Sequence, residues 1–259
     1  MIKELGISDA EKLLPFLYRE KELNLFIIGD IENAVLDNEN VKLFVDEESE
    51  KINGVLLKYF DSFVVYSPKT MDYRSAAKLI LEDHAKIVSG KAEHIEVLKP
   101  FLDGNIVNEK IMYFSKLFEL KPFENDDEVE LASENDAQEI LKLLSKIPEF
   151  RPQSAEAFIT SMRNGSSRRY FIRKEGKIVS TASTAAECKE MAMIVAVATD
   201  PKYRKRGLAT KIMNKMCLDL VRENKTVCLF YDNPEAGKIY ERIGFRQMAF
   251  WKMMYLKTS

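Results

Sequence analysis

A continuous apolar segment in the second half of the chain restricts its fold more than any other feature. Residues 191–198 read MAMIVAVA, and the tripeptide Thr-Asp-Pro follows them at 199–201. Eight apolar residues in a row predict a strand that is buried on both faces of a sheet, and the proline stops its ladder of hydrogen bonds. A basic turn at 204–207 and a helical pattern at about 207–223 come next. This order of buried strand, tight turn and helix indicates an α/β arrangement.

The turn at 204–210 (RKRGLAT) has the composition of an anion site. A glycine-bearing turn that opens a helix presents backbone N–H groups, and the helix dipole adds positive potential, so the turn suits a pyrophosphate. We expect Gly207 to let the anion approach the backbone, because a Cβ there would obstruct it. Ala209 keeps the next turn narrow. Neither a nucleotide P-loop nor a dinucleotide fingerprint is present. The formal charge comes from Arg204, Lys205, Arg206 and Lys211.

A second informative segment, 233–245 (NPEAGKIYERIGF), follows another predicted strand. Asn233 is a suitable N-cap, Pro234 suits the first helical position, and Gly244 ends the helix. Within this helix Tyr240 falls on the apolar face. The pattern therefore predicts that Tyr240 points inward, which fits a core position as well as a catalytic one.

The chain contains two series of elements in the same order, with the best boundary at 121–130 (KPFENDDEVE). Segments 64–80 and 196–212 both run from a strand through a turn with Pro-Lys into a helix. This similarity fits an internal repeat and, equally, convergence on a common unit. The expected strands lie at 41–47, 52–60, 62–68, 85–89, 106–118, 128–132, 169–174, 177–186, 190–199, 226–231 and 245–256. The expected helices lie at 9–20, 24–36, 72–82, 137–147, 154–164, 207–223 and 235–243.

The two halves of the chain differ in charge. Residues 1–127 carry 16 basic and 25 acidic side chains, a net charge of −9, and residues 128–259 carry 23 and 16, a net charge of +7. A positive second half suits a polyanionic ligand. Nucleic acid is a poor fit, because the basic residues are dispersed and not interleaved with aromatic ones. A small phosphorylated cofactor fits at least as well.

Several other classes of protein are disfavoured. The longest apolar run has eight residues, against the roughly 20 of a membrane-spanning helix, and the N-terminal residues do not resemble a secretory signal. Cys188, Cys217 and Cys228 have no ligand-like spacing and suggest reduced thiols in a cytoplasmic protein. Both histidines, His84 and His94, lie in the first half. No metal site is expected.

Together the two motifs resemble the GNAT superfamily of acyl-CoA-dependent N-acyltransferases. They are R-x-x-G-x-A after a buried strand, here 204–209, and N-x-x-A-x-x-x-Y-x-x-x-G-F, here 233–245. In the first half the equivalent turn, 70–76 (TMDYRSA), has no glycine, so that half resembles a degenerate copy that does not bind CoA. The resemblance implies an α/β (α+β) fold of two tandem GNAT-like domains, 1–122 and 128–259. Each would have a mixed, mostly antiparallel sheet flanked by helices.

The resemblance also implies where acetyl-CoA, or another acyl-CoA, would bind. Members of the superfamily splay two central strands to admit pantetheine, and here the turn 205–210 would hold the pyrophosphate. Tyr240 would face the thioester sulfur as an acid while an amine attacks the thioester directly in a ternary complex. A strand N–H near Val197 would stabilise the oxyanion. The implied cofactor-binding residues are Val197, Ala198, Thr199, Arg204, Lys205, Arg206, Gly207, Leu208, Ala209, Thr210, Asn233 and Lys238.

The general base is not fixed by the sequence. Many members of the superfamily carry a Glu fourteen positions before the motif glycine, where this chain has Met193. Glu187 and Glu190 lie just upstream, and Glu149 is in a loop expected to border the acceptor site. We take Glu190 as the working candidate for the base.

Three functions remain open at this stage. An N-acyltransferase acting on a small-molecule or peptide amine is favoured by Tyr240. A non-catalytic acyl-CoA-binding regulatory module is the alternative, and the missing Glu favours it. A protein-interaction scaffold leaves Gly207 and the basic turn unexplained. We expect a monomer or homodimer that binds neither nucleic acid nor membrane.

Overall fold

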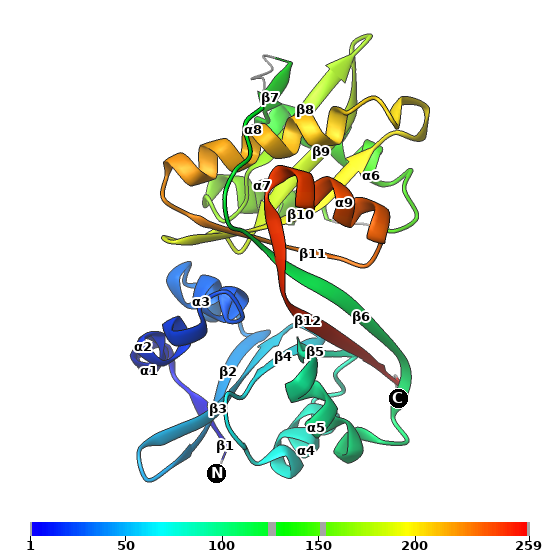
Figure 1. Ribbon diagram of the computed structural model, residues 1–259. Coiled ribbons are helices and arrows are strands. Elements are labelled where there is room, and N and C mark those ends of the chain that lie inside the picture. The colour runs from blue at the N-terminus through cyan, green and yellow to red at the C-terminus, as the bar shows by residue number, and fades with distance from the viewer. Residues whose placement is uncertain (1, 124–127, 151–153, 258–259) are drawn as a thin grey trace. The chain divides into compact units, whose positions relative to one another are not determined.

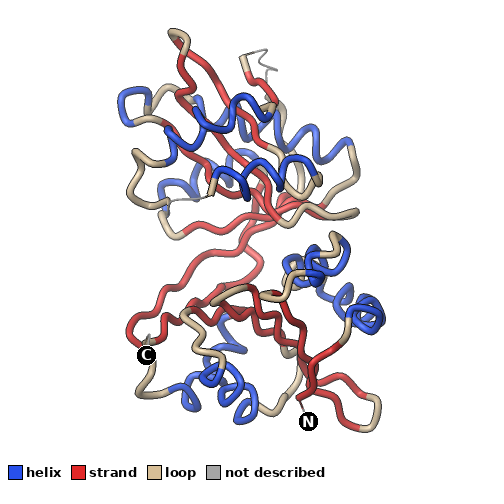
Figure 2. Tube along the Cα trace, turned by 180° about the vertical axis from the view of Figure 1, so that it is seen from behind, coloured by secondary structure: helices blue, strands red, loops and turns tan. Residues whose placement is uncertain are grey.

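The computed structural model describes residues 2–123, 128–150 and 154–257, and the chain forms two compact units (Figures 1 and 2). Unit 1 contains the residues up to Phe114 together with those from Met248 on, and unit 2 contains residues 115–247. The last strand, β12 (Phe245–Leu256), and the strand β6 (Ile106–Leu117) each contribute residues to both units.

Unit 1 is a mixed sheet with helices on both sides (Figure 1). Its strands follow the order β1-β2-β3-β4-β5, and residues 251–255 of β12 pair with β5. All of these pairs are antiparallel except β4 with β5, which is parallel. The strands are β1 (Ile2–Leu5), β2 (Val41–Glu48), β3 (Lys51–Tyr59), β4 (Ser62–Tyr66) and β5 (Ile87–Lys91). The helices are α1 (Ile7–Ala10), α2 (Leu14–Leu17), α3 (Leu25–Glu32), α4 (Tyr73–Glu82) and α5 (Ala92–Leu102).

Unit 2 repeats this order of elements around its own set of strands. Its strands follow the order β11-β10-β9-β8-β7, antiparallel except for the parallel pair β10 and β11. The strands are β7 (Val129–Leu131), β8 (Arg169–Lys174), β9 (Lys177–Ala185), β10 (Met191–Thr199) and β11 (Thr226–Tyr231). The helices are α6 (Ala137–Leu144), α7 (Ala155–Arg163), α8 (Leu208–Arg222) and α9 (Pro234–Ile243).

Two apolar cores hold unit 2 together, one on each face of its sheet. Ile212, Met213 and Met216 of α8 pack with Ile194 of β10 and form part of the larger core. On the other face, Phe158 of α7 packs with residues of α6 and of the sheet. The sheet is therefore covered on both sides, as the long apolar segment requires.

The expected fold class is confirmed, since the strand pairs in each unit are mixed, mostly antiparallel and flanked by helices. The domain limits 1–122 and 128–259 stay a prediction. Residues 124–127 of the expected boundary lie outside the described residues. The compact units also differ from the two expected segments, because residues 251–255 pair inside unit 1.

Three local expectations differ from the structure. The helix expected at 9–20 is broken into α1, α2 and two 3-10 turns. The helix expected at 24–36 ends at Glu32, and Ala34 beyond it takes a left-handed conformation. Helix α5 was not predicted, and it contains Pro100, a residue that argues against a helix interior.

Some features bear on the class of protein. No helix within the described residues is long and apolar enough to cross a membrane. Nor do three or more His, Cys, Asp or Glu side chains gather in these residues as a metal site would need. Within the described residues none of the three cysteines forms a disulfide, and all three are buried.

Candidate active site

The parallel strands β10 and β11 pair over only part of their length. Their register runs from Met191 opposite Thr226 to Ile194 opposite Leu229. Strand β10 then continues to Thr199 while it stays paired with β9 on its other side. A bulge between Val195 and Ala198, with Ala196 at a φ of 52°, re-aims this half of the strand. The two strands therefore part beyond Ile194.

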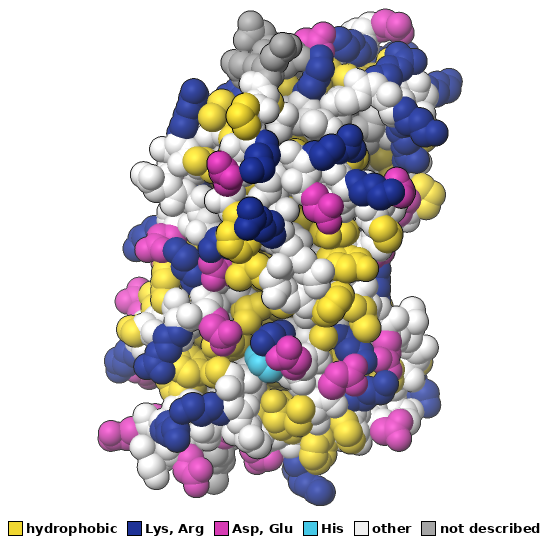
Figure 3. All heavy atoms as spheres, in the orientation of Figure 1, with side chains coloured by type: hydrophobic (Ala, Val, Ile, Leu, Met, Phe, Trp, Pro, Cys, Tyr) yellow, Lys and Arg dark blue, Asp and Glu magenta, His cyan; other side chains and the backbone are white. Residues whose placement is uncertain are grey.

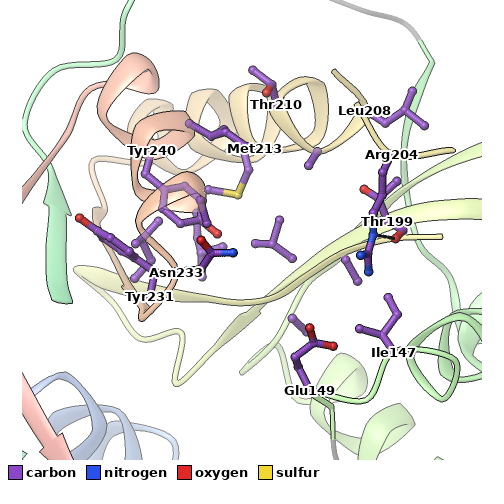
Figure 4. Close-up of a pocket in the computed structure, with 18 of the residues that line it drawn as sticks. Ile147, Glu149, Thr199, Arg204, Leu208, Thr210, Met213, Tyr231, Asn233 and Tyr240 are labelled. Carbon is purple, nitrogen blue, oxygen red and sulfur yellow. Dashed lines mark hydrogen bonds between the residues drawn. The ribbon is translucent and has the colours of Figure 1, made fainter. Parts of the chain in front are cut away.

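A cavity of about 530 Å³ opens where the strands part (Figure 4). Its walls come from the second half of β10, the turn before α8, the end of β11 with α9, and the loop at 147–150 after α6. Residues 195–197 are only half-buried because they line this cavity. The expectation that the whole apolar segment is buried on both faces is therefore wrong for these three residues. Their composition carried no sign of the bulge.

The turn before α8 has the backbone of an anion site. Lys205 and Gly207 have φ values of 62° and 77°, and Gly207 is the N-cap of α8. Successive left-handed and right-handed residues turn backbone N–H groups to one side, and the first N–H groups of a helix have no partner within it. A Cβ at Gly207 would meet nothing within 4 Å. The chain itself therefore leaves the space beside this glycine open.

The basic residues of the turn have different surroundings. Arg204 and Lys205 line the cavity, and Arg204 Nε donates a hydrogen bond to Thr199 O at 3.2 Å. Arg206 instead lies over the Tyr203 ring, with 5.1 Å from its guanidinium carbon to the ring centroid. Lys211 pairs with Glu128. On the face shown in Figure 3, basic side chains are prominent over unit 2.

Asn233 and Tyr240 both line the cavity (Figure 4). Asn233 Oδ1 accepts a hydrogen bond from the Glu235 N–H at 2.9 Å, which caps α9 as expected. Tyr240 is 9% exposed, and burial, with a smaller contribution from Tyr231, raises its pKa to about 12. The two tyrosine rings lie 5.5 Å apart. Tyr240 is therefore a buried phenol that stays protonated at neutral pH.

Most of the predicted cofactor-binding residues come together around this one cavity. Arg206 and Lys238 are the two that do not line it, and Lys238 pairs with Glu235 at 2.7 Å on the exposed side of α9. Sequence reasoning missed Tyr231 and Met213, which also line the cavity. The close contact between the Tyr231 ring and Gly237 could not be predicted from the sequence, because it forms only in the folded chain. A Cβ on Gly237 would lie 2.6 Å from Tyr231 Cε2.

The candidate bases lie in different places. Glu190 is exposed and precedes β10, at the end of the strand opposite to the cavity. Glu187 is 6% exposed and forms an ion pair with Arg168. Met193 is 1% exposed in the core. Glu149 lines the cavity, across it from Tyr240, and its carboxylate points into it (Figure 4).

The corresponding parallel strand pair in unit 1 is β4 with β5. The parallel pairing of β4 with β5 continues as far as Val65 opposite Gly90. A Cβ on Gly90 would lie 2.5 Å from Val65 O, so the two backbones approach unusually closely. The Tyr66 and His94 rings pack 5.9 Å apart beside the end of β4.

An open parallel strand pair, a basic turn at a helix N-terminus and a buried phenol thus meet in one cavity. Residues 153–254 match the model of the GNAT acetyltransferase family. The resemblance that the two motifs indicated is thereby confirmed. The general activity of this family is acyl transfer from acyl-CoA.

Solved structures share this fold over nearly the whole chain. A Drosophila protein has a TM-score of 0.74 at 12% identity, covering 100% of this chain and 99% of its own. A GCN5-related N-acetyltransferase from Sphaerobacter thermophilus has a TM-score of 0.64 at 13% identity, covering 98% and 94%. A tandem GNAT protein from the clavulanic acid biosynthesis pathway has a TM-score of 0.59 at 11% identity, covering 98% of each chain. At these identities the likeness establishes the fold. No curated protein matches the sequence.

Proposed function

We propose that this chain is an N-acyltransferase that moves an acetyl or other acyl group from acyl-CoA to an amine, by direct attack in a ternary complex. The observation that carries the proposal is the cavity between β10 and β11. The basic turn at 204–207 and Tyr240 both contribute to its walls. The backbone N–H groups at the start of α8, with Arg204 and Lys205, fit a pyrophosphate. Beyond Ile194 the register of β10 with β11 has ended, so the edge of β10 at Val197 fits an extended amide chain.

The role of Tyr240 follows from its burial. Its pKa of about 12 lies roughly 3.5 units above that of an ordinary thiol, near 8.5. Complete transfer of its proton to a departing thiolate would therefore cost about 5 kcal/mol, at roughly 1.4 kcal/mol per unit. Tyr240 then acts mainly by donating a hydrogen bond to the sulfur as negative charge develops on it.

We further propose that Glu149 accepts the proton that the attacking amine loses, through a water molecule. Its carboxylate faces the cavity opposite Tyr240 (Figure 4), whereas Glu190 and Glu187 do not line the cavity. Asp232 is the other carboxylate among the lining residues. An acid and a base on opposite sides of one cavity are the arrangement that acyl transfer to an amine needs.

A non-catalytic acyl-CoA-binding module is the second candidate, and one observation favours it. Position 193, where many relatives carry a glutamate, is a methionine that is 1% exposed and belongs to the core. Release of thiol from acetyl-CoA in the presence of a pool of amines decides between the two functions. Binding of acetyl-CoA without any amine-dependent release would establish the module.

Tyr240→Phe tests the chemistry directly. We expect kcat to fall on the order of 10²-fold, as the loss of a general acid commonly produces, while the dissociation constant of acetyl-CoA stays the same because the ring remains. Tyr170→Phe is the matched control, since it also removes a buried hydroxyl, bonded to Asp219 at 2.9 Å, but does not line the cavity.

The pH profile gives an independent check. Tyr240 is protonated below its pKa of about 12, so its acid form is present throughout the neutral range and is lost only at strongly alkaline pH. The wild-type kcat should therefore show no fall below about pH 10 from this group. Equal kcat values for wild type and Tyr240→Phe would remove Tyr240 from the mechanism.

A further inference from the structure

Part of the cavity wall lies on the side of the sheet that α6 and α7 cover, and it is mostly apolar. Four apolar residues line the cavity here, and each belongs to or packs against the core of that face: Ile147, Phe150, Ala196 and Ala198. Ile147 is 4% exposed, whereas Phe150 is half-buried and keeps part of its ring surface for a ligand. These four residues and Glu149, which also lines the cavity, form the α6-side wall.

Strand β10 leaves room beside this wall because its own residues there are small. Ala196 and Ala198 present only methyl groups, while Ile147 and Phe150 come from the loop after α6. Val197, between the two alanines, packs instead with the core on the α8 side. A ligand on the α6 side of the cavity therefore meets two methyl groups, a branched side chain and an aromatic ring.

Glu149 is the charged residue of the α6-side wall. Its carboxylate points into the cavity (Figure 4). Lys146, three residues earlier, pairs with Asp200 at 3.0 Å, and no described side chain pairs with Glu149. Among the described lining residues, the basic ones are Arg204 and Lys205, and both belong to the turn before α8. The wall therefore offers one negative charge, which attracts a cationic ligand.

These surroundings discriminate between classes of amine. The carboxylate of an amino acid would lie close to Glu149, with no cation of this wall to compensate it. The hydroxyl groups of an amino sugar would lose their hydrogen bonds to water against an apolar surface. The second ammonium group of a diamine would find no second carboxylate in the wall. A single ammonium group on an apolar body meets none of these costs.

We propose that the acceptor is a monoamine with an apolar body, an alkylamine or an arylalkylamine, whose ammonium group lies at Glu149 and whose body lies against Phe150. The ammonium group gives one proton to Glu149 through water. The neutral nitrogen then bonds to the thioester carbonyl carbon, the C–S bond breaks with its electron pair on sulfur, and the nitrogen releases its second proton as the thiolate takes one up. This inference rests on the proposed function for the reaction, but binding alone tests its ligand class.

Calorimetry on the full chain, with and without saturating CoA, measures amine binding without turnover. The probes are the straight-chain amines from propylamine to hexylamine, hexamethylenediamine, and the pair phenethylamine and L-phenylalanine. Affinity should rise roughly two- to fourfold per methylene group, because each group leaves water for the apolar wall. Hexylamine should bind about tenfold more tightly than the diamine, and phenethylamine about tenfold more tightly than the amino acid.

Variants of the wall locate the site. Phe150→Ala should lower the affinity for hexylamine about tenfold, because it removes apolar surface that the chain of the amine covers, and should leave CoA affinity unchanged. Phe101→Ala is the matched control, since Phe101 is 41% exposed on α5 and does not line the cavity. Glu149→Gln should lower the affinity for every amine about fivefold and keep the rise per methylene group.

The outcomes separate the ligand class from the reaction. The ligand class is overturned by equal affinities along the series, by a diamine or amino acid that binds as tightly as its monoamine counterpart, or by unchanged hexylamine affinity in Phe150→Ala. Should that variant not fold, unchanged affinity in Glu149→Gln has the same meaning. Monoamines that bind as expected but release no thiol from acetyl-CoA would support the class and refute only acyl transfer. Transfer to an amino acid and not to the monoamines would refute only the class.

Discussion

Replacing Gly207 by alanine separates the folding role of this residue from its role in binding. Gly207 has a φ of 77°, and a Cβ there would meet nothing within 4 Å. The cost to folding is therefore the left-handed conformation alone, about 1 kcal/mol once the lower entropy of the unfolded alanine chain is included. That corresponds to a melting temperature lowered by a few degrees in a domain of this size.

The effect on binding should be larger than this. The added methyl group stands in the open space at the cavity wall, where the turn would meet a phosphate. We expect the dissociation constant of CoA to rise at least tenfold, which is about 1.4 kcal/mol. Calorimetric titration with CoA measures this constant, and thermal unfolding monitored by circular dichroism measures the cost to folding.

Gly176 supplies the matched control. It has a φ of 73°, a Cβ there would also meet nothing within 4 Å, and it lies in the turn between β8 and β9, away from the cavity. Gly176→Ala should lower the melting temperature as much as Gly207→Ala does and leave CoA affinity unchanged. Equal CoA affinity in the two variants would refute the assignment of this turn to the pyrophosphate.

Two further predictions concern the number of CoA sites in the chain and the wall of the cavity. Calorimetry should find one CoA per chain, because the turn at 70–76 in unit 1 lacks a glycine like Gly207 at the start of α8; two equivalent sites would contradict the reading of unit 1 as a non-binding copy. Gly237→Ala should lower stability by about 1 kcal/mol and weaken CoA binding, because the new Cβ would lie 2.6 Å from Tyr231 Cε2 and overpacking outweighs the better helix propensity. Higher stability and normal CoA affinity in Gly237→Ala would show that the Tyr231 ring moves aside without a cost in free energy.

The sequence predicted the elements of unit 2 well because single residues with distinct local conformations begin and end its helices. Asn233 and Gly244 bound α9, and Gly207 begins α8, each by a conformation that few other residues favour. Tyr240 was correctly expected to face inward, since helical spacing alone fixes that face. Helix α5 was missed because Pro100 argues against a helix where the surrounding packing nevertheless sustains one.

The candidate site was less predictable where tertiary structure decides. The bulge at Ala196 has no signature in an all-apolar segment, yet it determines which residues line the cavity. Lys238 and Arg206 have the right charge but are engaged with Glu235 and Tyr203.

The composition of unit 1 has a consequence for how the chain folds during synthesis. Its strand β5, Ile87–Lys91, is completed by residues Trp251–Tyr255, which the ribosome makes more than half a chain later. At synthesis rates of about 5–20 residues per second, the edge of β5 waits on the order of ten seconds for its neighbour. Throughout that time the unpaired N–H and C=O groups of β5 can form hydrogen bonds with a strand of another chain. Trp251 is the single tryptophan and is 4% exposed in the folded chain. Its fluorescence would therefore show when residues 251–255 pair with β5. Until residues 251–255 have been made, β5 therefore lacks the antiparallel neighbour that it has in the folded chain.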